Sequence, residues 1–322
     1  MKEQSHLPSH QNFLGLESDH CDPVKARVII LPVPFEKTST FGAGSHHGPE
    51  AILSASRQVE LFDTELGHEP YRDTGGIATL VPLDIRECHG AEVADRLQRV
   101  VGYWLQHKKF MITLGGEHTS VVGAIRAHCR IFTDLTILQL DAHSDLRPEY
   151  QGSTWNHACT MARVLDFHDD LIQVGIRSQS GTEREIATDR GIFVSYAHEI
   201  HRQAAEGIHW TDRIIDATHS NVYISLDCDV FDPAIIPATG TPEPGGLTWG
   251  QIEALMAALC EKRQVVGMDV SELAPVAGVS YSEFTMAKLI YRFIGYRFNS
   301  KFQPDSMSSQ VAIQPKIDLD QG

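Results

Sequence analysis

Acidic and imidazole side chains gather in four short segments of the sequence, and each segment directly follows a run of apolar residues. The segments are Gly115–His118, Asp141–Asp145, Asp227–Asp229 and Asp269–Glu272. Apolar runs without polar alternation predict strands that are buried on both faces, as in a parallel sheet. Ligands bind beyond the carboxyl ends of the strands in such sheets. We therefore expect the four segments to converge in one crevice.

Six of these side chains are of the types that ligate metal ions, and we predict them as ligands. They are His118, Asp141, His143, Asp145, Asp227 and Asp229. A spacing of two residues along an extended chain places side chains on the same side, so Asp141, His143 and Asp145 can aim at one point. Four carboxylates packed together would repel and raise one another's pKa. Two divalent cations would remove that repulsion, lower the pKa of a shared water and deliver hydroxide at neutral pH.

The ligand types also bear on which metal would bind and what it would act on. An oxygen-rich set with some imidazole and no thiolate suits two Mn²⁺ ions, with Ni²⁺, Co²⁺, Fe²⁺ or Zn²⁺ left open. Glu272 is a natural partner for a planar cation, because a carboxylate accepts two parallel N–H bonds from a guanidinium. His157 is the candidate for proton transfer to a leaving amine. Asp145 could both ligate metal and hydrogen-bond the attacking oxygen.

Each of these residues also has an ordinary structural interpretation. His118 could be a turn residue, Asp227 and Asp229 could cap a helix, and His157 could be a solvated loop histidine. Asp269 and Glu272 could be salt-bridged structural groups. Taken together, these interpretations do not explain why ligand-type residues cluster at strand ends, and we therefore prefer the metal site.

The elements that would position these residues alternate between short apolar runs and amphipathic segments. The predicted strands are Arg27–Pro34, Phe110–Leu114, Leu135–Leu140, Leu171–Gly175, Val222–Leu226 and Gln264–Met268, with weaker candidates at Ile77–Leu83 and Gly191–Tyr196. Apolar residues three or four apart predict a helix over Ala91–Lys108. Thr248 and Gln251 can form a capping box for another, and Pro49 suits the first turn of a third. This alternation predicts an α/β fold with a parallel sheet between helical layers.

Composition limits the class of protein. The 322 residues have a formal net charge of −15, which argues against a nucleic-acid or anionic-membrane partner. Six cysteines without regular spacing indicate reduced, buried thiols, and no apolar run suits a signal peptide or a membrane span, so we expect a cytoplasmic protein. We predict a single catalytic domain over 27–300, a partly ordered N-terminal extension over 1–26, and a polar, disordered C-terminal tail over 301–322.

Several motifs around these residues resemble the ureohydrolase (arginase/agmatinase) superfamily. They are Gly-Gly-Glu-His at 115–118, DAHSDLR at 141–147, SLDCDVFDPAIIPATGTPEPGG at 225–246 and DVSELAP at 269–275. The resemblance implies a three-layer α/β/α fold with a mostly parallel central sheet, a Mn²⁺ pair on the six ligands, and a trimer or hexamer of identical chains. It also implies that Glu272 binds the guanidinium and that His157 shuttles the proton.

Within the superfamily the chain is more similar to agmatinases, because DLRPEYQGSTWNHAC matches their pattern around Arg147 and His157. This favours hydrolysis of agmatine to putrescine and urea. Arg147 could instead attract the carboxylate of guanidinobutyrate, and the bulky Trp155 could narrow the pocket for a shorter substrate such as guanidine. Guanidinopropionate and arginine also stay open, as does a non-catalytic metal-binding homologue that acts as a regulatory subunit. Single-zinc deacetylase chemistry is disfavoured, since six ligands are too many for it.

Overall fold

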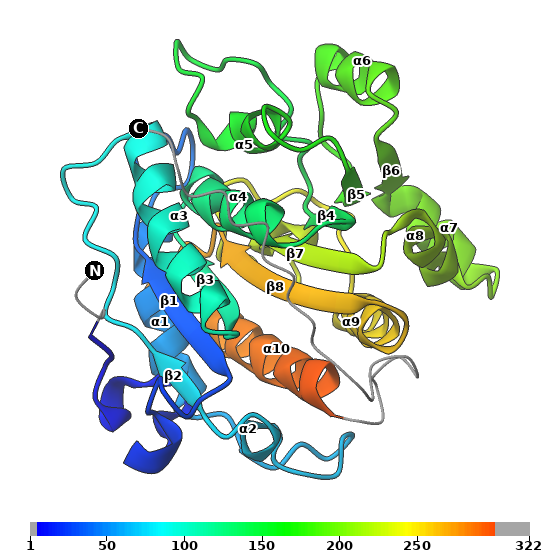
Figure 1. The fold of residues 1–322 in the computed structure, drawn as a ribbon. Coiled ribbons are helices and arrows are strands. Elements are labelled where there is room, and N and C mark those ends of the chain that lie inside the picture. The colour runs from blue at the N-terminus through cyan, green and yellow to red at the C-terminus, as the bar shows by residue number, and fades with distance from the viewer. Residues whose placement is uncertain (1–4, 300–322) are drawn as a thin grey trace.

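One eight-stranded sheet forms the centre of the molecule. The computed structural model describes residues 5–299. The strands are β1 (Val28–Val33), β2 (Ile77–Thr79), β3 (Phe110–Gly115), β4 (Leu135–Leu140), β5 (Leu171–Ile176), β6 (Phe193–Tyr196), β7 (Asn221–Asp227) and β8 (Gln264–Ser271). They lie in the order β2-β1-β3-β8-β7-β4-β5-β6, and every neighbouring pair is parallel (Figure 1). All eight predicted strands are present, although β2 is shorter than its apolar run.

Helices cover both faces of the sheet. They are α1 (Gly48–Ser56), α2 (Pro70–Asp73), α3 (Gly90–Gln106), α4 (Val122–Ile131), α5 (Thr160–Val164), α6 (Gly181–Asp189), α7 (Ala197–Ala205), α8 (Trp210–Ala217), α9 (Trp249–Lys262) and α10 (Tyr281–Phe298). One apolar cluster joins the sheet to α1, α2 and α7–α10, and a second joins it to α3–α6. Successive strand residues serve opposite clusters: Val28 and Ile30 face the first, whereas Ile29 and Leu31 face the second. The predicted three-layer α/β/α architecture is therefore confirmed.

The helix signals in the sequence are borne out where they were strongest. The Thr248 hydroxyl accepts from the backbone N–H of Gln251, and the side-chain oxygen of Gln251 accepts from the backbone N–H of Thr248. Pro49 lies in the first turn of α1. A second box of the same kind starts α6, where Ser180 and Glu183 pair. This pair was not recognised in the sequence, and its Glu183 also lines the cavity of the site.

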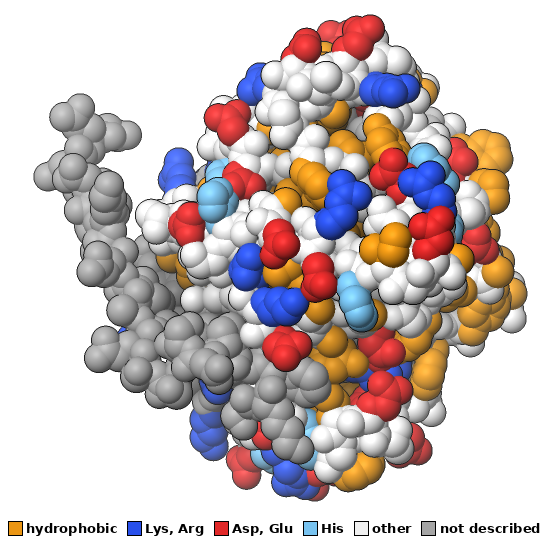
Figure 2. All heavy atoms as spheres, turned by 90° about the vertical axis from the view of Figure 1, so that its right-hand side faces the viewer, with side chains coloured by type: hydrophobic (Ala, Val, Ile, Leu, Met, Phe, Trp, Pro, Cys, Tyr) orange, Lys and Arg blue, Asp and Glu red, His pale blue; other side chains and the backbone are white. Residues whose placement is uncertain are grey.

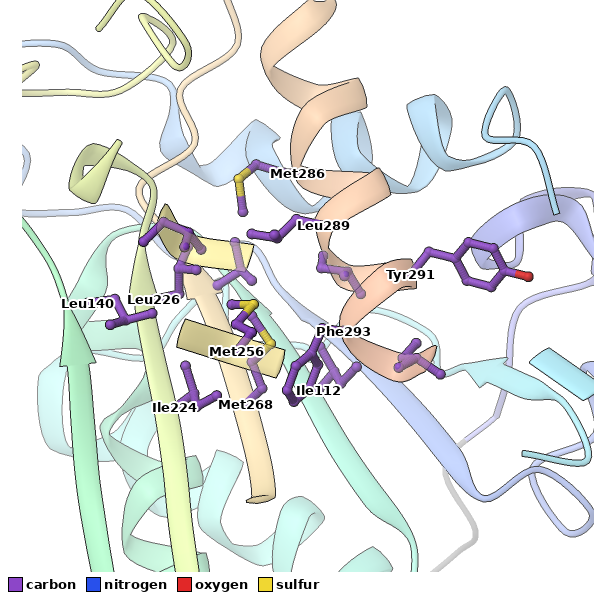
Figure 3. Close-up of a cluster of buried hydrophobic side chains, with 14 of the residues drawn as sticks. Ile112, Leu140, Ile224, Leu226, Met256, Met268, Met286, Leu289, Tyr291 and Phe293 are labelled. Atoms are coloured by element: carbon purple, nitrogen blue, oxygen red, sulfur yellow. The ribbon is translucent and has the colours of Figure 1, made fainter. Parts of the chain in front are cut away.

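The larger of the two cores lies between the sheet and helices α9 and α10. Figure 3 shows Met256 of α9 and Leu289 and Phe293 of α10 directed toward strand residues such as Ile224 and Met268. Truncation of such a fully buried aromatic residue typically costs about 3–5 kcal/mol. This packing holds β7 and β8 rigidly, and the ends of these two strands carry much of the site.

The N-terminal segment packs onto this same domain. Residues 9–20 form three single 3-10 turns, η1 (Ser9–Gln11), η2 (Phe13–Gly15) and η3 (Ser18–His20). Phe13 is fully buried, and its backbone N–H donates to the Thr79 hydroxyl at the end of β2 (3.0 Å). Part of the N-terminal segment thus packs against the sheet of its own chain. The tail predicted over 301–322 lies outside the described residues.

The surface carries charges of both signs (Figure 2), and the cysteines are unpaired, as the sequence predicted for them. Figure 2 shows acidic and basic side chains interspersed over one face of the molecule. No helix between residues 5 and 299 combines the length and apolarity needed to cross a membrane. All six cysteines are free, and Cys228 is packed into the larger core, as expected for a residue that points away from its aspartate neighbours.

Candidate metal centre and cavity

The four chemistry-bearing segments meet at the carboxyl ends of β3, β8, β7 and β4, which are consecutive neighbours in the middle of the sheet. Two further 3-10 turns start at these ends: η5 (His118–Val121) after β3 and η7 (Cys228–Val230) after β7. A cavity of about 270 Å³ opens above them. The predicted site residues among its lining are His143, Asp145, Arg147, His157, Asp227, Asp229 and Glu272.

The predicted ligands form two overlapping groups that could each hold an ion. His118, Asp141 and Asp227 form one group, and Asp141, His143 and Asp229 form the other, with ligand atoms within 4.8 Å of one another in each. Asp141 belongs to both groups and so can bridge two ions. The sixth predicted ligand, Asp145, places Oδ2 3.0 Å from His118 Nδ1. The structure therefore brings all six residues to one place.

The charges within this cluster are unbalanced. Burial, together with Asp229 and Asp145, raises the pKa of Asp141 to about 7, and burial raises the pKa of Asp227 well above its usual value. Burial acts to lower the pKa of His143, but Asp229 and Asp141 outweigh it and raise that pKa to about 10. Protons thus partly compensate a concentration of negative charge. Divalent cations would do so without protonation, and this donor set fits a pair of them.

His118 is held by a hydroxyl and a carboxylate behind it. Its Nδ1 faces the aspartates, whereas Nε2 lies 3.1 Å from the Ser225 hydroxyl. Ser225 donates its own proton to Asp269 (2.9 Å), so its oxygen can only accept from Nε2–H. This arrangement fixes the tautomer that leaves the lone pair of Nδ1 for a metal. Asp269, Ser225 and His118 are all buried.

Glu272 and Asp145 both adopt backbone conformations that side-chain-bearing residues rarely use, with φ of 61° and 53°. Such strain persists where surrounding contacts over-determine it and is common at functional sites. The Glu272 Oε1 accepts from the backbone N–H of His118 (2.7 Å). The carboxylate is directed to the cavity in this way, and burial raises its pKa well above the usual range.

His157 lies at the start of a 3-10 turn, η6 (His157–Cys159), which Asn156 caps. Its backbone N–H donates to the Thr38 hydroxyl (2.9 Å), and its ring Nδ1 lies 3.3 Å from the same oxygen. Thr38 donates in turn to the buried carboxylate of Glu117 (3.0 Å). The histidine ring lines the cavity.

Arg147 and Trp155, the two residues predicted to contact the substrate tail, occupy different surroundings. Arg147 lines the cavity, stacks over the Tyr150 ring at 4.8 Å and lies 3.6 Å from the Glu183 carboxylate. Trp155 is not among the lining residues. Its ring lies close against Gly90, where an added Cβ would approach it to 2.7 Å. The structure therefore gives no support to the interpretation that Trp155 narrows the cavity.

Sequence reasoning missed several polar residues that hold the others in place. Gln139 donates to Asp141 Oδ2 (2.7 Å), and Gln173 donates to Gln139 (2.6 Å). Both are fully buried within strands. A polar residue inside an otherwise apolar strand was the available signal, because a buried amide needs a partner. Thr38 had no such signal, since it lies in a loop about 80 residues from Glu117.

The chain is similar to known proteins over most of its length. The model of the Arginase family matches residues 26–295. An N(1)-aminopropylagmatine ureohydrolase of Thermus thermophilus is 40% identical over 274 residues, covering 85% of this chain and 91% of that protein. The Synechocystis protein of the same name is 38% identical over 277 residues, covering 84% and 89%.

A solved structure extends the similarity to the fold. The crystal structure of the agmatine ureohydrolase of Thermoplasma volcanium superposes with a TM-score of 0.77 at 30% identity, covering 89% of this chain and 94% of that one. The region that the family model matches contains every residue of the cluster and of the cavity. The chain therefore belongs to the arginase family and is an agmatinase-like ureohydrolase, a hydrolase that acts on the C–N bonds of linear amidines.

Proposed function

We propose that the chain releases urea from the guanidino group of a linear polyamine, with N(1)-aminopropylagmatine preferred over agmatine. The observation that carries a guanidinium substrate is Glu272, a half-buried carboxylate that lines the cavity beside the candidate metal ligands. The relatives named for aminopropylagmatine are 33–40% identical, whereas those named agmatinase are 29–31% identical. Agmatine, which the sequence motifs favoured, becomes the second substrate.

The outer part of the cavity supports a cationic rather than an anionic tail. Arg147 is the one guanidinium or ammonium group among the described lining residues, and Glu183 lies beside it. A substrate carboxylate would have to compete with Glu183 for that cation. Because Trp155 turns away toward Gly90, it does not close the region into which a longer tail would extend.

The chain's own residues account for the remaining requirements of the reaction. Two divalent ions, most suitably Mn²⁺, would lower the pKa of a water and supply hydroxide at neutral pH. Glu272 holds the guanidinium and orients its carbon. As oxygen bonds to that carbon and the carbon–nitrogen bond to the alkyl chain breaks, the electron pair leaves with the alkyl nitrogen. His157 gives that nitrogen a proton, and the hydroxyl group now on the carbon loses its proton to the Asp145 carboxylate, so that a neutral amine and neutral urea result.

The test is urea release by the purified full-length chain with Mn²⁺ and, separately, with Ni²⁺. The substrates are N(1)-aminopropylagmatine, agmatine, guanidinobutyrate, guanidinopropionate, guanidine and arginine. We expect kcat/KM to be highest for N(1)-aminopropylagmatine and next for agmatine. A higher value for either guanidino acid or for guanidine would contradict the proposed tail. No urea from any compound with either metal would favour a non-catalytic homologue instead.

A further inference from the structure

The Thr38 side chain contacts two groups of the site that lie far apart in the sequence. Its hydroxyl is 3.0 Å from Glu117 Oε1, 2.9 Å from the backbone nitrogen of His157 and 3.3 Å from His157 Nδ1. A hydroxyl has one proton to donate and two lone pairs to accept with. These three contacts use all of that capacity, so the direction of each bond can be worked out.

Glu117 decides where the hydroxyl proton goes. Its Oε2 accepts from the backbone N–H groups of Lys37 (2.7 Å) and Thr38 (2.6 Å), and its Oε1 accepts from the Thr119 hydroxyl (2.5 Å). A carboxylate surrounded by donors in this way acts as an acceptor only. If Thr38 donated to His157 instead, its oxygen would face Glu117 Oε1 at 3.0 Å with no proton between them. The Thr38 proton therefore lies on the Glu117 side.

The two lone pairs of Thr38 are then left for His157. One lone pair accepts from the backbone N–H of His157, which can only donate. The second lone pair accepts from Nδ1–H of the ring. We infer that Thr38, backed by Glu117, is a positioning residue that fixes the Nδ1–H tautomer of His157 and so leaves Nε2 as the one ring atom that exchanges a proton with the substrate.

This inference rests on the proposed role of His157 and specifies the atom involved. The neutral ring binds a proton at Nε2 and gives it to the nitrogen of the departing amine, while Nδ1–H stays bonded to Thr38 throughout. Ring orientation follows from the same contacts, because the backbone and the ring of His157 are tied to one oxygen. The Thr160 hydroxyl holds the other side of the residue by donating to the His157 carbonyl (2.8 Å).

The loop that carries Thr38 is itself anchored. Lys37 donates from Nζ to the carbonyl of Cys88 (2.7 Å), close to Gly90, on which Trp155 packs. The loops around residues 38, 89 and 155 thus support one another. Trp155 serves this support rather than the substrate, which gives a physical reason for a bulky residue two positions before His157.

Kinetics of variants test the inference in the metal-loaded enzyme. Thr38→Val keeps the shape but removes the acceptor, and we expect kcat to fall about 10- to 100-fold at nearly constant KM, a part of the ~10²–10⁴-fold that a positioned acid–base group contributes. Thr38→Ser should restore most of the rate. Thr285→Val, on the outer face of α10, is the matched control and should leave kcat and the melting temperature unchanged.

Two results in these kinetics would overturn the inference. One is a Thr38→Val enzyme as active as the wild type, and the other is a Thr38→Ser enzyme as impaired as Thr38→Val. When His157→Asn is already present, adding Thr38→Val should lower kcat by less than about 2-fold further, because the effects of residues that act as a unit are not additive. Full multiplication of the two losses would show that Thr38 acts independently of His157.

A second measurement does not depend on turnover and so separates this inference from the proposed function. Two-bond ¹⁵N–¹H correlation spectra of the chelator-treated, histidine-labelled full chain at about pH 8.5, above the ordinary histidine range, report the tautomer. The His157 signals are identified by their loss in His157→Asn. We expect Nδ1 protonated and Nε2 bare, and a mixture of tautomers in Thr38→Val. An Nε2–H tautomer in the wild type would contradict the inference even if urea is released.

Discussion

Two histidines of the site, His118 and His157, are each held by a hydroxyl that donates to a buried carboxylate, but different parts of the fold supply these supports. Behind His118, Ser225 and Asp269 are directly paired residues of the neighbouring strands β7 and β8. Behind His157, Thr38 comes from a loop and Glu117 from the turn after β3. One support is part of the sheet, and the other joins separate loops.

The two supports also select opposite ring nitrogens. The Ser225 hydroxyl accepts from Nε2–H of His118, which leaves Nδ1 of that ring free to bind a metal. The Thr38 hydroxyl accepts from Nδ1–H of His157, which leaves Nε2 of that ring free to carry a proton. A metal ligand has to stay still, and a strand pair inside the sheet provides that. A proton-transferring group has to match a bound substrate, so loops that line the cavity are suitable for it. The comparison predicts that changes behind His118 affect metal binding and that changes behind His157 affect turnover.

The largest effect should come from Asp141, since it is the predicted ligand that both groups share. Asp141→Ala should abolish urea release and reduce the bound metal, with a loss larger than the roughly 10- to 100-fold that follows removal of a partner behind a ligand. Metal content by elemental analysis and initial rates would measure it. Glu149→Gln, an exposed acid of the same segment, is the control and should keep both. Wild-type activity in Asp141→Ala would refute the metal centre.

Ser225→Ala is the direct counterpart of Thr38→Val. Without the acceptor at Nε2, His118 can turn or change tautomer, so metal affinity should fall about 10- to 100-fold. A titration with Mn²⁺ would show activity that returns at high metal concentration. Thr38→Val should show no such recovery. If excess metal rescued both variants, or neither, the division between the two supports would be wrong.

The third prediction concerns pH. Burial, with Asp229 and Asp145, raises the pKa of Asp141 from 3.8 to about 7. Burial acts to lower the pKa of His143, but the negative charge of Asp229 outweighs it and raises that pKa to about 10. A pKa raised in the folded state contributes stability at low pH that is lost as pH rises through the folded value. The chelator-treated protein should therefore become less stable between about pH 4 and 10. Bound cations replace those protons, so the gain in melting temperature on adding Mn²⁺ should increase with pH.

Thermal melts at several pH values, with and without metal, measure this gain. Asp229 acts in the opposite direction: burial opposes the shift, but His143 lowers its pKa to about 2, so its contribution is lost only in strong acid. Ionisation of Asp229 therefore does not affect how stability changes with pH above about pH 4. A metal-induced gain that stays constant from about pH 5 to 9 would mean that the aspartates are not the groups that bind the cations.

The same division explains what could be predicted from the sequence. The predicted ligands at 118, 141–145 and 227–229 follow apolar runs, and a parallel sheet must bring the ends of such runs to one edge. Near-continuous apolar runs also located six strands, and the two weaker candidates correspond to β2 and β6. The loop contacts had no such rule, because nothing in the local sequence places residue 38 beside residues 117 and 157. Trp155 was misjudged for the same reason: its partner Gly90 is 65 positions away.

The smallest effect is expected at the rim of the cavity. Arg147 is partly exposed and lies beside Glu183, so its charge is already compensated and screened by solvent. Arg147→Gln should therefore change KM for a cationic guanidine by no more than about fivefold, the upper end for an exposed ion pair, with kcat unchanged. The experiment compares N(1)-aminopropylagmatine with guanidinobutyrate in both enzymes. If Arg147 instead held a substrate carboxylate, the variant would lose the guanidino acid selectively by far more than about fivefold. Substrate choice would then depend on this one loop residue, and the cationic tail inferred from its pairing with Glu183 would be wrong.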